Sequence, residues 1–261
     1  MTGPRANTPI DRYARIGRAR GRGAIHLAKK NIDVLRRTPA YSFGEAAHYL
    51  GLPVSTLRAW CLGQGYAYKG QSRRFRPLIK LDGKPTEGLS FLNLVEAHVL
   101  AGIRRAHGVP LPKVRTAVAF VADELGVDRP LAHVRFQTDG INLFVEELGR
   151  LLNASQGGQM GMVDILQAYL RRVERDPAGV PIKLYPFTRN SSTAESPAPV
   201  EIDPRVSFGR PVLKGRGVPT AILADRFKAG DLIVDLAKDY DTSPQAIEEA
   251  IRCELDRRQA A

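Results

Sequence analysis

A short segment, VSTLRAW, brings two hydroxyl groups and a guanidinium close together: Ser55, Thr56 and Arg58 fall within four positions. A planar guanidinium can donate two hydrogen bonds to a guanine edge or a phosphate, whereas a hydroxyl group donates one. If the segment begins a helix, its first turn can present these side chains to the bases in a groove. An alternative is that Ser55 and Thr56 only cap the helix, because both residue types are favoured at N-caps.

A group of tyrosines and arginines follows in YAYKGQSRRFRP. Two β-prone runs flank the central turn, which predicts a hairpin beside the preceding helix. Tyr66 and Tyr68 could each place a hydroxyl group near a phosphate, although tyrosines half-buried in a strand have the same pattern. We expect the clustered arginines to contact phosphates or a minor groove, with a solvated basic turn as the alternative; they are Arg73, Arg74 and Arg76.

The residues before this polar segment predict how it is positioned. The stretch YSFGEAAHYLGLPVSTLRAW contains two short apolar-periodic segments on either side of Gly51. Ser42 is suited to cap the first segment, and Glu45 three residues later completes a capping box. Ala47, Gly51 and Leu57 have the spacing of a helix-turn-helix, in which a small residue lies at the helix contact, a glycine in the turn and an apolar anchor in the second helix.

A second unit with the same spacing follows near the C-terminus, where Ala237, Asp241 and Ile247 repeat these offsets. Its last helix carries several carboxylates, which repel phosphate, so we expect this unit to contact a protein rather than DNA. The carboxylates are Glu248, Glu249, Glu254 and Asp256. The alternative is that basic residues of its leading loop touch a DNA backbone; these are Arg210, Lys214 and Arg216.

The residues between the two units predict a small α+β segment. Alternation around Asp139-Gly140 predicts a β-hairpin, followed by a helix near Met162–Arg175 and the extended run VPIKLYPF. We therefore expect a mainly α protein with small β elements. Its expected parts are a basic flexible arm (1–40), a winged helix-turn-helix domain (41–127), a small α+β segment (128–188), a linker (189–202) and a C-terminal three-helix helix-turn-helix domain (203–261).

Charge is distributed unevenly along the 261 residues, whose formal net charge is +12. Residues 1–120 carry 21 basic and 6 acidic side chains, whereas residues 121–261 carry 18 basic and 21 acidic ones. A cationic half joined to a nearly neutral half is expected when one end of a chain meets a polyanion such as nucleic acid.

Other chemistry has little support in the sequence. The five histidines lack metal-site spacing, and acidic pairs such as Asp123-Glu124 are adjacent and so point apart on a helix. We expect no catalytic site, metal or cofactor.

Cys61 and Cys253 have no second cysteine nearby, so we expect both to be reduced and structural. We expect Trp60 to be a core anchor. No apolar run is long enough to span a bilayer, and the N-terminus lacks a secretory signal, so we expect a cytoplasmic protein.

The stretch from Tyr41 to Val127 resembles the DNA-binding domain of MerR-type regulators. GEAAHYLGLPVSTLRAW matches their first two helices, and SRRFRP stands where their wing carries an Arg-aromatic signature. The match covers about a third of the chain. It does not continue into the long coiled-coil helix of that family, because Pro130 and Asp139-Gly140 interrupt it.

The stretch from Asp203 to Asp256, which contains FGRPVLKGRGVPTAILADRFKAGD, is similar to the small helix-turn-helix family catalogued as domain of unknown function 433. Combined with the N-terminal likeness, it resembles VapB-type antitoxins that partner PIN-domain ribonucleases. The resemblance implies an autorepressing antitoxin of a type II toxin-antitoxin system. Such a protein would bind double-stranded operator DNA and neutralise a PIN-domain toxin encoded by a neighbouring gene.

Two other functions remain open at this level. A free-standing MerR-like regulator could sense a small molecule or a protein effector through residues 127–190, whose apolar side chains could line a pocket or form a core. These are Phe136, Phe144, Tyr169, Leu184, Tyr185 and Phe187. An enzyme acting on nucleic acid would need an acidic metal cluster that the spacing does not supply. In each case one short helix contacts few base pairs, so we expect a homodimer or higher assembly, formed through residues 127–190 or the C-terminal unit.

Overall fold

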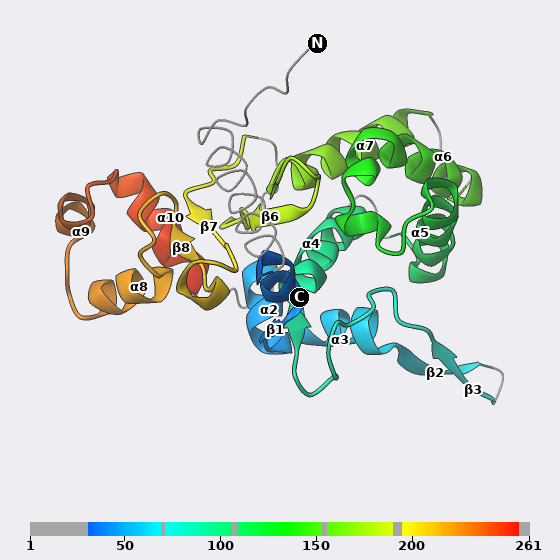
Figure 1. The fold of residues 1–261 in the computed structure, drawn as a ribbon, viewed down its shortest axis with the longest axis horizontal. Coiled ribbons are helices and arrows are strands. Elements are labelled where there is room, and N and C mark those ends of the chain that lie inside the picture. The colour runs from blue at the N-terminus through cyan, green and yellow to red at the C-terminus, as the bar shows by residue number, and fades with distance from the viewer. Residues whose placement is uncertain (1–30, 69–70, 106–108, 153–155, 190–194, 256–261) are drawn as a thin grey trace, which may run out of the picture.

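Helices dominate the computed structural model, which describes residues 31–68, 71–105, 109–152, 156–189 and 195–255 (Figure 1). Its labelled helices are α2 (Phe43–Leu50), α3 (Val54–Leu62), α4 (Phe91–Arg105), α5 (Leu111–Leu125), α6 (Ile141–Leu152), α7 (Gln156–Leu170), α8 (Thr220–Lys228), α9 (Ile233–Asp239) and α10 (Pro244–Glu254). Its strands are β1 (Pro39–Tyr41), β2 (Gln64–Tyr68), β3 (Gln71–Phe75), β4 (Leu89–Ser90), β5 (Val173–Arg175), β6 (Pro181–Leu184), β7 (Val200–Glu201) and β8 (Val212–Leu213).

The strands of the described residues form small antiparallel pairs, in which β1 pairs with β4, β2 with β3, β5 with β6 and β7 with β8. Helices provide most of the remaining structure. The expected mainly α fold with small β elements is therefore confirmed.

The first helix pair begins and turns where the sequence predicts. The Ser42 hydroxyl accepts a bond from the amide of Glu45 at 3.2 Å, and the Glu45 carboxylate accepts one from the amide of Ser42 at 2.9 Å, which completes the capping box. Gly51 ends α2 with φ of 61°, and the amide of Leu52 bonds to the carbonyl of Ala47 at 2.9 Å. This left-handed turn sends the chain directly into α3.

The C-terminal pair α9–α10 repeats that turn geometry. Asp241 has φ of 46°, and the amide of Thr242 bonds to the carbonyl of Ala237 at 2.9 Å. Ala237 and Ile247 are buried, as are their counterparts in the first pair. The repeated spacing thus corresponds to a repeated structure.

A single hydrophobic core joins the first helix pair to the middle of the chain. Every residue of α4 from Phe91 to Ile103 is buried, as expected for a helix that is enclosed on all sides. Trp60 lies in this core, which confirms it as an anchor beneath α3. The core also takes in side chains of α5, α6, α7, β5 and β6. Residues 128–188 therefore pack on the N-terminal unit.

The predicted hairpin at Asp139-Gly140 was wrong. Residues Phe136–Gly140 form a π-helical turn that leads directly into α6. The buried side chains that follow are spaced by three or four residues, which is a helical stripe rather than strand alternation; they are Ile141, Phe144, Val145 and Leu148. Gly140 lies against the Leu125 side chain, so the glycine that suggested a turn instead lets α6 approach α5 closely.

Three other boundaries differ from expectation. The helix expected near Met162–Arg175 is α7, which ends at Leu170, and a hairpin of β5 and β6 follows it. Residues 31–37 of the expected flexible arm are helical, and the buried guanidinium of Arg36 in this helix pairs with Asp33 at 3.0 Å and Asp176 at 2.9 Å. Residues 1–30 lie outside the described residues. Strand β7 begins within the range that we assigned to the linker.

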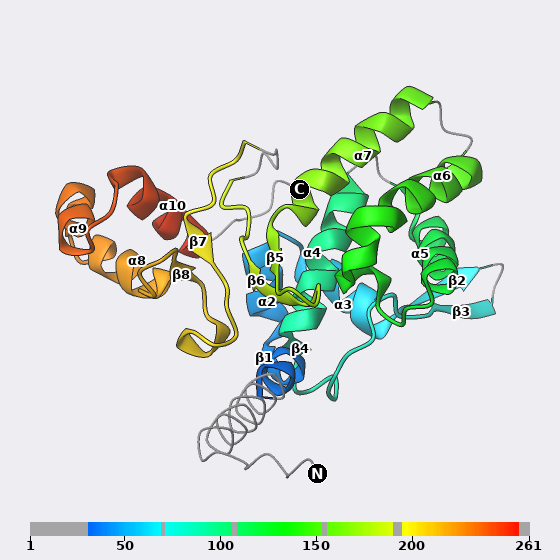
Figure 2. The ribbon, with the colours of Figure 1, turned by 45° about the horizontal axis from the view of Figure 1, so that its top comes forward.

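The C-terminal unit, which contains α8, α9 and α10, lies to one side of the other helices (Figure 2). It has a core of its own and is attached to the first unit through specific polar contacts. The hydroxyl of Tyr41 donates to the carbonyl of Gly209 at 3.0 Å, and this contact is buried. Arg210 pairs with Glu45 at the start of α2. On the other side, Arg189 donates to buried Glu249 of α10 at 2.7 Å.

Replacing Gly209 by alanine should loosen this junction. Gly209 has φ of 77°, and a Cβ atom there would overlap the Tyr41 hydroxyl. We expect Gly209→Ala to lower the free energy of unfolding by about 2–4 kcal/mol, from the left-handed backbone and from overpacking together.

The matched control is Gly126→Ala, because Gly126 has φ of 63° but open space around it. It should lose only the backbone part, about 1–2 kcal/mol. Urea unfolding followed by circular dichroism measures both variants, and equal losses would show that the Tyr41 contact imposes no steric limit.

Candidate nucleic-acid interface

The first turn of α3 presents the predicted polar side chains. The helix begins at Val54 with Pro53 as its N-cap, and no side chain makes a capping bond there. Ser55 and Thr56 are therefore the second and third residues of the helix, and the alternative that they are N-caps was wrong. Ser55 and Arg58 are exposed, whereas Thr56 is half-buried.

Arg58 is oriented by an aromatic ring of the preceding helix. Its guanidinium lies 5.1 Å from the centre of the Phe43 ring, in a cation–π contact. Phe43 is itself buried at the start of α2. The contact limits the rotamers of a long side chain, so that less conformational entropy is lost when Arg58 binds a partner.

A groove of about 710 Å³ runs beside Arg58. Its walls come from the N-terminal ends of α2 and α3 and from the loop Pro85–Gly88. Helix N-termini carry unpaired amide groups and partial positive charge, which favour phosphate oxygens. Thr86, which is exposed on this loop, is not among the residues predicted from sequence; the charged, turn-rich run LDGKPTEG was the available signal.

The predicted hairpin is formed by β2 and β3, which project from the body of the protein beyond α3 (Figure 1). In its register Tyr66 is paired with Arg73, Gly65 with Arg74 and Tyr68 with Gln71. Arg76 follows β3 and is exposed.

Two contacts fix the base of the hairpin. The Arg115 guanidinium of α5 donates to the carbonyl of Arg76 and lies 5.8 Å from the centre of the Phe75 ring. Gly63 has φ of 76°, and a Cβ atom there would strike the Phe75 carbonyl. The hairpin thus follows the C-terminal end of α3, and its base is joined to α5.

The second helix pair lacks this basic surface. Each of its residues is numbered 190 above its counterpart, so Glu248 stands where the first pair has Arg58, and Gln245 where it has Ser55. Glu249, one residue further, is buried and bonded to Thr188 and Arg189. With a carboxylate in place of the guanidinium, α10 is a poor reader of DNA.

A buried polar network holds the loop that lines the groove. The Asn93 side-chain amide of α4 donates to the Lys80 carbonyl at 2.8 Å, and its oxygen accepts from the Asp82 amide at 3.2 Å. Arg129 donates to Asp82 at 3.0 Å and lies 3.7 Å from Glu96. Burial raises the pKa of Glu96 to about 7, against the lowering effect of Arg129 and Asn93.

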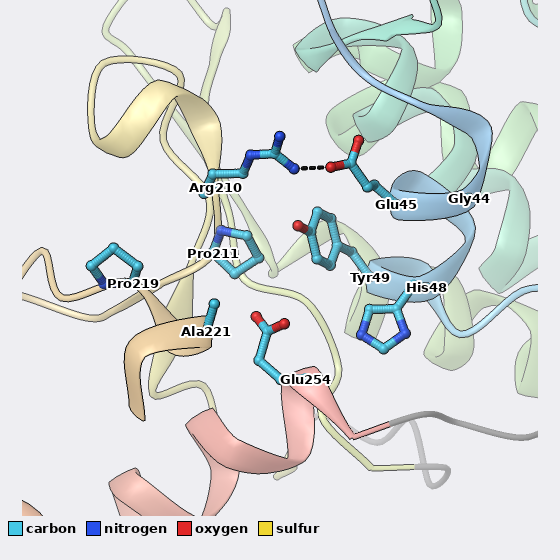
Figure 3. A pocket seen from close by; sticks show the side chains of 9 residues that line it. All are labelled: Gly44, Glu45, His48, Tyr49, Arg210, Pro211, Pro219, Ala221 and Glu254. Carbon is cyan, nitrogen blue, oxygen red and sulfur yellow. Dashed lines mark hydrogen bonds and ion pairs between the residues drawn. The ribbon is translucent and has the colours of Figure 1, made fainter. Parts of the chain in front are cut away.

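A second cavity lies at the junction of the two units (Figure 3). It has a volume of about 530 Å³ and is lined by α2 and by residues of the C-terminal unit. Arg210 reaches across it to Glu45 and also bonds to Tyr49, while Glu254 accepts a bond from the Thr220 hydroxyl. Glu45 and Arg210 are thus paired with each other, whereas Glu254 is held by a neutral hydroxyl group.

The described residues contain no group of three or more histidine, cysteine or acidic side chains placed to hold a metal ion. Cys61 and Cys253 are buried and not joined in a disulfide, and burial raises the pKa of the Cys61 thiol to about 12. In the part of the chain that the structure describes, no helix has both the length and the apolarity needed to cross a bilayer.

Two parts of the chain match known protein families. Residues 39–118 match the family described as "Putative DNA-binding HTH domain", and residues 200–252 match "Protein of unknown function (DUF433)". The chain therefore has a helix-turn-helix domain at the N-terminus and a DUF433 domain at the C-terminus. The second match confirms the resemblance to domain of unknown function 433.

Relatives from Mycobacterium tuberculosis (strain ATCC 25618 / H37Rv) are similar over most of the chain. "Putative antitoxin VapB45" is 29% identical over 236 residues, which cover 82% of this chain and 92% of that protein. "Uncharacterized protein Rv2308" is 26% identical over 219 residues, which cover 81% and 88%. The first of these likenesses confirms the resemblance to VapB-type antitoxins.

The crystal structure of Rv2018 from Mycobacterium tuberculosis has a similar fold, with a TM-score of 0.58 and 23% identity. The match covers 82% of this chain and 97% of that chain. The two proteins therefore share a fold over most of this chain.

Glu96 should make the stability of the protein depend on pH. An unfolded glutamate titrates near pH 4.3, whereas burial raises the pKa of folded Glu96 to about 7. Between these values the unfolded chain loses a proton that the folded chain keeps. The contribution of Glu96 protonation to the free energy of unfolding is therefore complete below about pH 4 and is lost as pH rises through about 7.

The variant Glu96→Gln imitates the protonated group and should flatten the fall in unfolding free energy between about pH 5 and pH 8. Glu124→Gln, at an exposed position of α5, is the control and should keep the fall. Denaturant unfolding at several pH values measures both, and an unchanged slope in Glu96→Gln would contradict the assignment.

Arg58 and Arg73 should differ in their effects on DNA binding. We expect Arg58→Ala to weaken operator binding by about 1–3 kcal/mol with a smaller effect on nonspecific DNA, because base contacts carry specificity. Arg73→Ala should weaken both alike and reduce the salt dependence, because phosphate contacts do not depend on sequence.

Glu248→Ala changes the counterpart of Arg58 in the second unit and serves as the control, with no loss of affinity expected. Fluorescence anisotropy at several salt concentrations distinguishes the variants. Equal specific and nonspecific losses for both arginine variants would remove the distinction between base reading and phosphate contact.

Proposed function

We propose that this protein is a sequence-specific DNA-binding antitoxin of a type II toxin-antitoxin system. In this proposal the winged helix-turn-helix binds double-stranded operator DNA and represses the protein's own operon. A later part of the chain binds and neutralises a PIN-domain ribonuclease toxin encoded by a neighbouring gene. The observation that carries the DNA-binding part is the exposed first turn of α3, with Arg58 oriented over Phe43 beside a groove of helix N-termini.

Charge and the chemistry of the side chains add support. The basic first half of the chain contains both α3 and the β2–β3 hairpin, and the proposed DNA contacts are Ser55, Thr56, Arg58, Tyr66, Tyr68, Arg73, Arg74 and Arg76. The antitoxin part is supported by the relative named "Putative antitoxin VapB45". We propose no catalytic role, cofactor or metal for this protein. We also propose that it acts in the cytoplasm, where the operator DNA is located.

We also propose that the protein acts as a homodimer or higher assembly. One helix such as α3 contacts too few base pairs for specificity, and two copies on a two-fold site double the contact. Light scattering with and without DNA tests this, since a single species of monomer mass in both samples would oppose it.

A second candidate is a free-standing transcriptional regulator with a small-molecule or protein effector. It needs a ligand site in the middle of the chain. The aromatic side chains that could have lined such a site mostly lie in the shared core, which favours a structural role; these are Phe136, Phe144, Tyr169 and Phe187. Tyr185 is half-buried, and its hydroxyl bonds to Glu174.

Co-expression with the PIN-domain protein of the neighbouring gene tests the antitoxin proposal. We expect a complex that survives purification and a culture that grows despite the toxin. The same purified protein should retard DNA from upstream of its own gene. Absence of a complex together with unrelieved toxicity would refute the antitoxin part, whereas a ligand-dependent footprint without a toxin gene would favour the second candidate.

A further inference from the structure

Val54 is an apolar side chain that faces outward at the first position of α3. It is 40% exposed, whereas Leu57, the apolar anchor of the same helix, is fully buried. An exposed valine adds little to the stability of the fold, because most of its apolar surface stays in water. Its position on the helix, rather than its exposure alone, indicates what it contacts.

Val54 and Arg58 lie on the same face of α3. They are four residues apart, which is about one turn, so their side chains are neighbours on the helix surface. Both line the groove of about 710 Å³ that runs beside α3. A partner that reaches Arg58 along this groove therefore meets an apolar side chain next to the guanidinium.

The groove also contains a carboxylate, which is held by its own loop. The Glu87 carboxylate accepts a hydrogen bond from the amide of Lys84 at 2.8 Å. Several other lining residues are apolar: Pro39, Ala40, Phe43 and Pro85. The exposed turn of α3 thus offers apolar surface and the guanidinium that the Phe43 ring orients.

The edges of the bases in a major groove match this pair of side chains. The C5-methyl group of thymine is the apolar group there, and guanine offers two acceptors, O6 and N7, that suit an arginine. Four helical residues span about 6 Å, which corresponds to one or two steps of base pairs stacked about 3.4 Å apart. Val54 and Arg58 can therefore contact bases that are close together in one site.

We propose that Val54 is a specificity-determining residue that packs on the C5-methyl group of a thymine in the operator. That thymine lies within about two base pairs of the guanine that Arg58 contacts. This inference rests on the proposed DNA-binding function. It adds a residue to the proposed DNA contacts and names the base that the residue recognises.

Deoxyuridine tests the contact, because it differs from thymidine only by the missing methyl group. The probe is DNA from upstream of the protein's own gene, prepared once with thymidine and once with deoxyuridine. We expect the wild type to bind the deoxyuridine duplex about fourfold more weakly for each methyl group that it buries. Fluorescence anisotropy measures both affinities.

The variant Val54→Ser removes the apolar side chain and should keep the helix, because serine and valine have similar helix propensities. It should bind the thymidine duplex about as weakly as the wild type binds the deoxyuridine duplex. Its own preference for thymidine should be lost. Val54→Ile keeps an apolar side chain and should retain the preference.

Two further variants serve as controls. Val234→Ser makes the same substitution at a valine of α9 that is 51% exposed, and it should keep the wild-type affinity and the wild-type preference for thymidine. Arg58→Ala should bind more weakly but still prefer the thymidine duplex, because Arg58 does not contact the methyl group in this proposal.

Substitution of single bases locates the two contacts. One thymine should matter to the wild type and not to Val54→Ser when deoxyuridine replaces it. One guanine should matter to the wild type and not to Arg58→Ala when 7-deazaguanine, which lacks the N7 acceptor, replaces it. A separation of more than about two base pairs between them would refute the proposed arrangement.

The outcomes separate the two proposals. If the wild type does not bind the upstream DNA, the DNA-binding part of the proposed function fails. If the wild type binds both duplexes equally well, or if Val54→Ser keeps the preference for thymidine, the thymine contact is refuted and DNA binding stands.

Discussion

The enclosure of α4 on all sides is the constraint on which the rest of the structure depends. The helix packs against α2 on one side and α7 on another, so the first helix pair and the middle helices share one core. Polar groups within it must find partners, and Asn93 finds them in the loop that borders the groove. The position of α4 thus fixes both the helix pair and the groove wall beside it.

The sequence predicted local structure best where a single residue type has few conformational options. Ser42 and Glu45 predicted the start of α2, and Gly51 predicted its end, because caps and left-handed turns depend on residues that are close in the sequence. The β-hairpin predicted at Asp139-Gly140 was wrong because the same dipeptide suits a hairpin turn or a close helix contact. Only the packing against Leu125 decides between the two structures. The ion pair of Arg36 with Asp176 joins residues 140 positions apart, and no local pattern predicts it.

The candidate site likewise has some features that the sequence predicted and others that only the folded chain shows. Spacing indicated that α3 would carry Ser55 and Arg58, but the cation–π contact with Phe43 and the groove beside Pro85–Gly88 needed the folded chain. The two helix pairs show how far spacing alone can be trusted. They have the same turn and the same buried anchors, yet the exchange of Arg58 for Glu248 puts opposite charges at the equivalent position of the second helix.

Glu45 takes part in two structures at once. One carboxylate oxygen closes the capping box of α2, and the other pairs with Arg210, which lies 165 positions away in the sequence. Glutamine at this position would keep a cap but lose the charge pair, and loss of Arg210 would leave a half-satisfied carboxylate at the junction. Substitutions at these two positions should therefore be coupled, and a domain taken from a relative should join well only if it carries the matching partner of this pair.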